Sequence, residues 1–214
     1  MAWTDRSGLA AREPFSRDHT DALDEFLVSG GDGRLTLSAQ SENAYGCTPF
    51  PANGLIDFAS STASAISPQA YARARAAREE LLTASLHQGP DAACEAAVAT
   101  ARTALLNHLQ LRDAEVVFSA SGTDAQLQTL FLVRLLNPGT LATVIVGADQ
   151  TGSGTAHTAR GRHFSQTTST GAAVEKGQVI TGLDGIESHE VGFRDAGGDF
   201  RSAAGMDAAV LKAI

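Results

Sequence analysis

The chain has 214 residues, of which 43% are hydrophobic and 19% are charged, and its formal net charge is -8. This composition is typical of a globular protein with one or two packed domains, and the negative balance argues against a general nucleic-acid-binding surface. There is no apolar run of membrane-spanning length, and the polar first 18 residues do not form a secretory signal. Cys47 and Cys94 lie far apart, which favours free thiols in a reducing, cytoplasmic compartment, and no cysteine or histidine cluster has metal-ligand spacing.

The N-terminal third is predicted to be mostly irregular. Residues 1–20 form a polar arm, and the pattern over 20–28 fits a short helix that Gly30 and Gly31 stop. Residues 34–66 are rich in Ser, Asn, Gly and Pro, and loops of this kind often line binding sites. We therefore expect residues 1–66 to form an arm and a substrate-side segment.

A pair of long helices is predicted next. Ser67 suits an N-cap and Pro68 the first helical position, and residues 69–86 have high helix propensity. A Gly-Pro break follows, after which Asp91 caps a second predicted helix over 92–109.

The remaining sequence alternates between strands and helices. Short buried apolar runs alternating with amphipathic segments indicate an α/β fold with a mostly parallel sheet. The predicted strands are 115–119, 141–148, 178–182 and 187–194, and the predicted helices are 123–136, 154–163 and 206–214.

The junction between the first of these strands and its helix is the most informative segment. Free amides at the start of the helix point outward, and the helix dipole adds partial positive charge there. Ser121 and Thr123 supply hydroxyls, and Gly122 permits close approach of a ligand to the backbone. The junction is a candidate seat for a phosphate group, although the same residues also suit an ordinary helix cap and turn.

The run Ser121-Gly122-Thr123-Asp124-Ala125, after a buried strand and a helix pair, resembles the phosphate cup of fold type I pyridoxal-phosphate enzymes. That family includes aminotransferases and cysteine desulfurases. The resemblance spans roughly residues 40–214. It implies a three-layer αβα sandwich, with residues 67–214 as the front, incomplete half of the large cofactor-binding domain.

The resemblance also implies roles for individual residues. The cofactor is pyridoxal 5'-phosphate, its phosphate is held by Ser121, Gly122 and Thr123, and an amino acid is the substrate. In the family a residue after the second strand stacks on the pyridine ring, but no aromatic residue stands there in this chain. The implied ring contacts are Gln150, Thr151 and His157, and the candidate substrate contacts are Asn43, Tyr45, Arg160 and Arg162.

Two groups that this chemistry requires are missing from the predicted site. The family uses a Schiff-base lysine and an acid facing the pyridine nitrogen, both of which follow later strands. The chain's only lysines are Lys176, in a loop-like setting, and Lys212, in a C-terminal helix, and neither fits that role. We therefore expect a second polypeptide to carry the lysine and the acid, with such pairs assembled as a dimer. The source of the missing half stays open between a separate gene product and another piece of a longer protein.

Two other functions remain as alternatives. A non-catalytic scaffold subunit of such an enzyme would also lack the reactive residues. A nucleotide-binding module is suggested by Gly152 and Gly154 after the 141–148 strand, but the glycine spacing does not match the dinucleotide-binding pattern.

Overall fold

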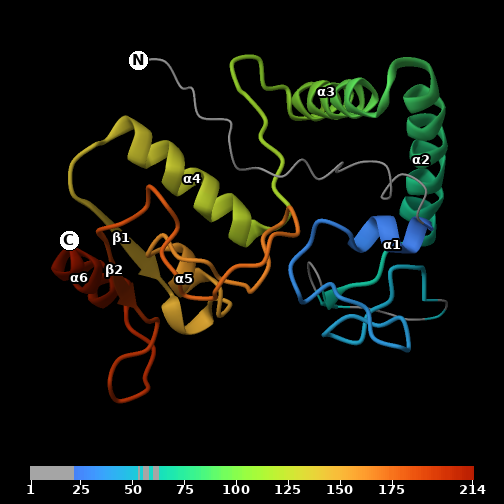
Figure 1. Ribbon diagram of the computed structural model, residues 1–214. Helices are drawn as coiled ribbons and strands as arrows, with labels where there is room; N and C mark the ends of the chain where they lie inside the picture. The colour runs from blue at the N-terminus through green and yellow to red at the C-terminus, as the bar shows by residue number, and fades with distance from the viewer. Residues whose placement is uncertain (1–21, 53, 55–57, 60–62) are drawn as a thin grey trace. The chain divides into compact units, whose positions relative to one another are not determined.

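The computed structural model describes residues 22–214, except 53, 55–57 and 60–62 (Figure 1). The chain divides into two compact units. One contains the described residues up to Ser29 and Arg34–Val117, and the other contains Gly30–Gly33 and Phe118–Ile214. The main division therefore falls after Val117, and the helix pair that the sequence assigned to the large domain belongs to the first unit. No helix in the described part of the chain is both long and apolar enough to cross a membrane.

The first unit contains the helices α1 (Leu23–Val28), α2 (Pro68–Gln88) and α3 (Pro90–Leu109). The helix pair begins where the sequence predicts, because the Ser67 Oγ accepts a hydrogen bond of 3.1 Å from the Ala70 amide. Gly89, with φ of 87°, turns the chain between α2 and α3. The Tyr71 hydroxyl donates a hydrogen bond of 2.7 Å to Asp24 Oδ1 and ties α2 to α1.

The second unit contains a parallel sheet. Its strands are β1 (Leu141–Val146) and β2 (Ile186–Val191), paired in parallel with Leu141 opposite Ile186. This confirms mixed α/β architecture with parallel pairing. Two strands are too little sheet to establish the predicted three-layer sandwich.

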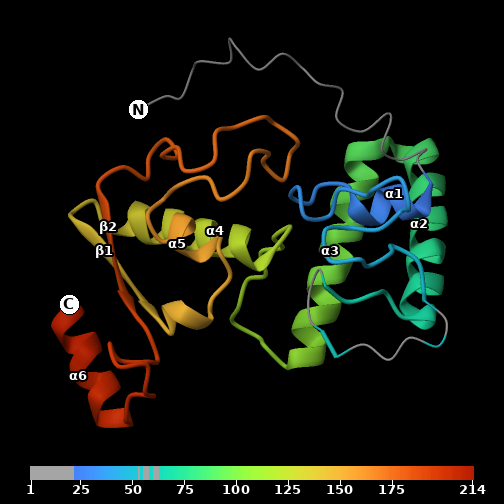
Figure 2. The same cartoon turned by 90° about the horizontal axis from the view of Figure 1, so that it is seen from below.

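Helices cover both sides of this strand pair. These are α4 (Gly122–Leu136), the short α5 (Thr155–Thr158) and α6 (Ala203–Ala213). Helices α4 and α5 lie on one side and α6 on the other, as both ribbon views show (Figures 1 and 2). The buried apolar residues of the unit come from four different segments: Leu130, Ile145, Leu183 and Val191.

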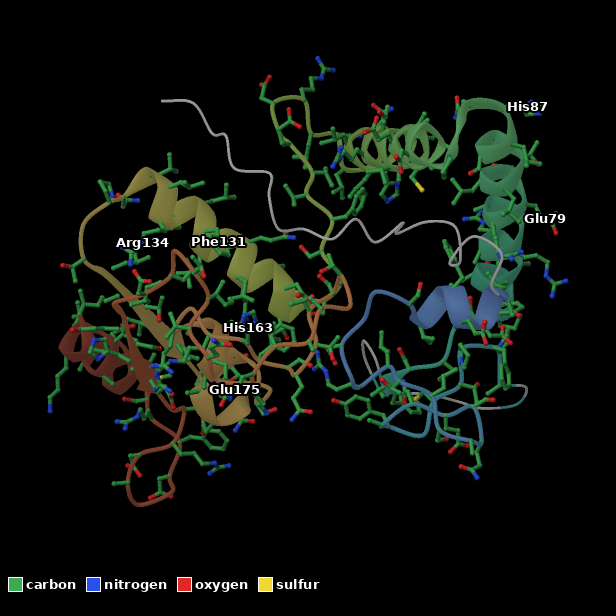
Figure 3. The ribbon with its side chains drawn as sticks, in the orientation of Figure 1. Glu79, His87, Phe131, Arg134, His163 and Glu175 are labelled. Atoms are coloured by element: carbon green, nitrogen blue, oxygen red, sulfur yellow. The ribbon has the colours of Figure 1, made fainter. Side chains whose placement is uncertain are left out.

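The C-terminal half of α4 is anchored to the loop that precedes β2. Arg134 Nη2 donates a hydrogen bond of 2.8 Å to the Asp184 carbonyl, and Nη1 donates one of the same length to the Gly139 carbonyl. Figure 3 shows Arg134 and Phe131 on the side of α4 that faces the rest of the unit. The position of α4 over β1 is therefore held by defined contacts.

Three predicted elements differ from the structure. Residues 115–119 form no strand, and Val117 is 65% exposed, because an apolar run becomes a strand only where another backbone pairs with it. Residues 178–182 contribute only an isolated antiparallel bridge between Val179 and Arg162. The helix predicted over 154–163 ends at Thr158, because Gly161 adopts φ of 64° and packs against Leu183.

Candidate anion-binding groove

The start of α4 is capped by its own side chains. Ser121 is the N-cap, with φ of -150°, and its Oγ accepts a hydrogen bond of 3.1 Å from the Asp124 amide. The same hydroxyl donates a hydrogen bond of 2.6 Å to the Asp124 carboxylate. Within the described residues, no acceptor meets the amides of Gly122 and Thr123. The 15-residue helix therefore presents two free donors and the positive end of its dipole.

The space next to the Gly122 Cα atom is open. Within the described part of the chain, a Cβ atom added at Gly122 would meet nothing within 4 Å. Gly122 lies at one end of a groove of about 650 Å³ between α4, β1 and α5. Packing of the fold therefore does not require a glycine at position 122. A ligand bound close to the backbone there would require it, because a side chain would occupy the same space.

The groove has uncharged walls. Its lining residues from α4 are Gly122, Ala125, Gln126, Thr129, Leu130 and Val133; those from elsewhere are Leu141–Val146, Thr151, Thr155, Thr158 and Ala159. The helix and the strand run in opposite directions (Figure 1), so Gly122 lies at the end of the groove where β1 finishes. We call this end, defined by Gly122, Val146, Thr151 and Thr155, the cup end.

One predicted ring contact reaches the groove and its neighbour does not. Thr151 lines the groove beside Gly122, and its hydroxyl donates a hydrogen bond of 3.1 Å to the Ala148 carbonyl. Gln150 lies in the 3-10 turn η2 (Ala148–Gln150), and its Nε2 donates a hydrogen bond of 3.1 Å to the Asp149 carbonyl. Gln150 is outside the set of described residues that line the groove.

His157 lies away from the groove. A Cβ atom at Gly177 would be 3.8 Å from the His157 Cε1, so the imidazole faces the loop around residue 177. Burial lowers the pKa of His157, and the positive charges of Lys176, Arg160 and Arg162 lower it further. His157 is outside the set of described residues that line the groove, whereas the adjacent Thr158 is among them.

The two predicted substrate arginines are occupied by framework contacts. Arg160 forms an ion pair of 3.0 Å with Glu190 of β2. Arg162 donates a hydrogen bond of 2.8 Å to the Gly177 carbonyl. The guanidinium of neither residue lines the groove in the described structure.

The predicted substrate contacts near the N-terminus belong to the first unit. Asn43 Oδ1 accepts hydrogen bonds of 2.9 Å from the Tyr45 amide and 3.1 Å from the Cys47 amide, which makes a polar turn. Asn43 also lines a separate pocket of about 290 Å³, while Tyr45 is 50% exposed. The side chain of Asn43 is therefore engaged in holding its own loop.

Several groove residues carry functional groups that the sequence did not single out. Thr158 is buried, with 1% exposure, and its hydroxyl donates a hydrogen bond of 2.6 Å to Gln126 Oε1 across the groove wall. Thr155 adds a hydroxyl at the cup end. The hydrogen bond between Thr158 and Gln126 joins residues far apart in sequence, so no local pattern predicts it. The only available sign of these residues in the sequence was that Thr155 and Thr158 are three positions apart, a spacing that places side chains on one face of a helix.

Asp149 is a second residue that sequence reasoning passed over. It lies three residues after the end of β1, and its Oδ1 accepts a hydrogen bond of 2.8 Å from the Phe193 amide after β2. That backbone hydrogen bond lowers the pKa of Asp149. The position of an acid shortly after a buried strand was the signal that could have identified it. Asp149 joins the carboxyl ends of the two strands, next to the cup end.

Lysines and metal ligands are absent from the groove. Lys176 lies near His157, and Lys212 is exposed on α6. Neither lines the groove, and the described residues contain no cluster of His, Cys, Asp and Glu that could hold a metal. A Schiff-base lysine or a carboxylic acid at the groove would therefore have to come from outside its described lining residues.

Comparison with known proteins gives no match. No family model, curated protein or solved structure matches this chain. The likeness to pyridoxal-phosphate enzymes therefore rests on the sequence Ser121–Ala125 and stays a prediction.

Proposed function

We propose that the cup end of the groove binds the phosphate of pyridoxal 5'-phosphate, and that the chain is the phosphate-holding subunit of an enzyme acting on an amino acid. One observation carries the proposal. Gly122, at the open start of α4, and Thr151, after β1, line the same groove although they are far apart in sequence. Both were expected to contact the cofactor on sequence grounds.

The residues present suit the phosphate end of the cofactor. The amides of Gly122 and Thr123 are free donors, the Thr155 hydroxyl can add another, and a dianion at a helix start is favoured by the dipole. The Thr151 hydroxyl would have to exchange its hydrogen bond to the Ala148 carbonyl for one to the phosphate. None of the described lining residues carries a charged side chain, so none of them repels the phosphate.

The residues do not suit the reactive end of the cofactor. When bound in such enzymes, the cofactor supplies an electron sink for breaking bonds at an amino acid's α-carbon. This chain's contribution would be to bind the phosphate, orient the ring and exclude water along the groove. The Schiff-base lysine and the acid facing the pyridine nitrogen would come from a partner chain, with such pairs assembling as a dimer.

Exposed apolar side chains of the second unit support the need for a partner. On α4, Leu132 is 57% exposed and Leu135 is 79% exposed, and Phe200 is 68% exposed in the connection to α6. Exposed apolar surface of this kind marks places where another protein packs. A partner that completes the three-layer sandwich would bury part of it.

Calorimetric titration of the full chain with pyridoxal 5'-phosphate tests the phosphate role. Gly122→Val places a side chain in the open space at the start of α4, and we expect at least a tenfold loss of affinity, which is about 1.4 kcal/mol. Gly139→Val is the matched control, since a Cβ atom at Gly139 also meets nothing within 4 Å of the described structure. Equal affinities of the two variants would reject the proposal. If the chain is a purely scaffolding subunit, the unsubstituted chain and both variants would show no binding of pyridoxal 5'-phosphate.

A further inference from the structure

The connection from α5 to β2 folds back on itself as an irregular hairpin. It spans residues 162–179 and is drawn in orange in Figure 1. An isolated antiparallel bridge joins Arg162 to Val179, and the Gly177 amide donates a hydrogen bond of 2.8 Å to the His163 carbonyl. These backbone contacts hold the two arms of the hairpin side by side at its base.

Three side chains with nitrogen donors meet at the base of this hairpin. The His157 carbonyl accepts a hydrogen bond of 3.0 Å from the Arg162 amide, so both residues belong to the end of α5. Arg162 Nη1 donates a hydrogen bond of 2.8 Å to the Gly177 carbonyl, and a Cβ atom at Gly177 would be 3.8 Å from the His157 Cε1. Lys176 directly precedes Gly177, and its positive charge acts on the imidazole. The guanidinium, the ammonium and the imidazole therefore gather around one glycine.

These three side chains have donors to spare. Among the residues that the structure describes, no hydrogen bond or ion pair engages the His157 imidazole or the Lys176 ammonium, and Arg162 uses only Nη1 of its guanidinium. His157 is half-buried, and a polar group without a partner costs more free energy there than at the surface. The cluster is therefore able to accept a ligand that brings hydrogen-bond acceptors.

The carboxylates nearby in the fold leave two of the cations unpaired. Arg160, also at the end of α5, forms its ion pair of 3.0 Å with Glu190. Glu175 precedes Lys176 in sequence but makes no ion pair with it in the described structure. Arg162 and Lys176 thus stand beside the imidazole without an acidic partner, although the chain as a whole has a net charge of -8.

The same surroundings act on the proton of His157. Burial lowers the pKa of its imidazole, and three positive charges lower it further, those of Lys176 on the hairpin and of Arg160 and Arg162 at the end of α5. The imidazole is therefore mostly uncharged at neutral pH. An anion bound beside it would favour the protonated form and raise the pKa, so that a proton is taken up on binding.

We infer that His157, Arg162 and Lys176 form a second anion-binding site, which takes a small oxyanion with two negative charges. The two unpaired cations match that charge, and all three side chains donate hydrogen bonds to oxygen. None of the three lines the groove, so this site is separate from the cup end. The inference goes beyond the proposed phosphate role and does not depend on it.

Proton–carbon correlation spectra of the histidine rings in the full chain test the inference. The chain is titrated with sodium sulfate and with sodium oxalate, which represent tetrahedral and carboxylate dianions, and with sodium chloride at matched ionic strength as the control for screening. We expect a saturable shift of the His157 resonance with sulfate or oxalate and none with chloride. The affinity should be at least about threefold higher at pH 6 than at pH 8, because binding takes up a proton. Tighter binding of sulfate would assign the ligand to phosphate or sulfate esters, and tighter binding of oxalate to carboxylic acids.

Two lysine variants form a matched pair for the same titration. Lys176→Gln removes an ammonium that has no partner in the described structure, and we expect at least about a fivefold loss of affinity with no loss of folding. Lys212→Gln, at an exposed position on α6, removes the same charge far along the chain and should leave the affinity unchanged. Gly122→Val should also leave the His157 response unchanged, since the site does not use the groove.

Five results would overturn the inference. They are an unchanged His157 resonance, an equal response to chloride, an affinity that does not depend on pH, equal losses in the two lysine variants, and loss of the His157 response in Gly122→Val. A chain that fails to bind pyridoxal 5'-phosphate but still gives the His157 response would reject only the cofactor role of the groove.

Discussion

The hydroxyl of Thr158 donates a hydrogen bond of 2.6 Å to Gln126 Oε1 and so joins α5 to α4 at the wall of the groove. Thr158 is buried, with 1% of its surface exposed, and its hydroxyl also meets the Thr155 carbonyl at 3.1 Å. Gly154, directly before α5, also lies close to the Thr123 side chain at the start of α4. We expect the width of the groove to depend on the Thr158–Gln126 bond.

Thr158→Val tests that dependence. The substitution preserves shape but leaves Gln126 without its donor, which should lower the free energy of unfolding by about 1–3 kcal/mol. Chemical denaturation measures the change. Thr129→Val is the control, because Thr129 is exposed and its hydroxyl only bonds the Ala125 carbonyl within α4. A loss no larger than that of the control would contradict a role for the Thr158–Gln126 bond.

Asp149 should make the second unit sensitive to acid. Its folded-state pKa is lowered, chiefly by the hydrogen bond from the Phe193 amide. Its contribution to stability is therefore fully present above the unfolded pKa, about 3.9, and is lost as pH falls through the lower folded pKa. We expect Asp149→Asn to lower the melting temperature at pH 7, with the difference from the unsubstituted chain shrinking below about pH 4. A difference that stays constant from pH 7 to pH 3 would argue against this hydrogen bond as the cause.

Gly147 should tolerate a side chain less well than Gly185, a glycine in the same backbone region. It has φ of 71°, and a Cβ atom there would lie 2.5 Å from Cε2 of the Phe193 ring. Gly185 has φ of 69°, but a Cβ atom would meet nothing within 4 Å of the described residues. We expect Gly185→Ala to cost about 1–2 kcal/mol from backbone strain, and Gly147→Ala about 1–3 kcal/mol more from the steric clash.

The double variant Gly147→Ala, Phe193→Ala separates the two causes. Removal of the ring should recover the clash part of the loss and leave the backbone part, as a thermodynamic cycle measures. Additive effects of the two substitutions would show that the ring does not restrict position 147.

The parts of the fold that local sequence determines were predicted well. The caps at Ser67 and Ser121 and the apolar run of β1 define α2, α4 and β1, because caps and periodicity act within a few residues. The prediction of a strand at 115–119 was wrong because strand formation is not a local property. A strand needs a backbone partner from another part of the chain, and the segment itself does not specify one.

The sequence identified only part of the candidate groove. Gly122 at the start of α4 and Thr151 after β1, both assigned to the cofactor on sequence grounds, line one groove, and their contact with a cofactor stays a prediction. Arg160 and His157 were assigned by type and proximity in sequence. Their actual partners, Glu190 and the loop at Gly177, lie far along the chain, and no local pattern specifies such contacts.

Asp124 should weaken anion binding at the cup end while it stabilises the helix. Its carboxylate is in the first turn of α4, held by the Ser121 hydroxyl at 2.6 Å. Asp124→Asn should tighten inorganic phosphate binding about two- to fivefold and destabilise the helix by about 0.3–1 kcal/mol, because a negative charge at a helix start is favourable alone but repels a second one. Calorimetry and denaturation measure the two effects. Phosphate affinity that falls in this variant would mean that Asp124 assists binding.

The central claim is that the amides of Gly122 and Thr123 hold a phosphate dianion. Proton–nitrogen correlation spectra of the labelled full chain, titrated with pyridoxal 5'-phosphate and in parallel with inorganic phosphate, observe these two amides directly. We expect their resonances to show the largest downfield proton shifts in both titrations, with Thr151 next. Saturable shifts that instead centre on His157 and Lys176, while the amides of Gly122 and Thr123 stay unchanged, would contradict the claim.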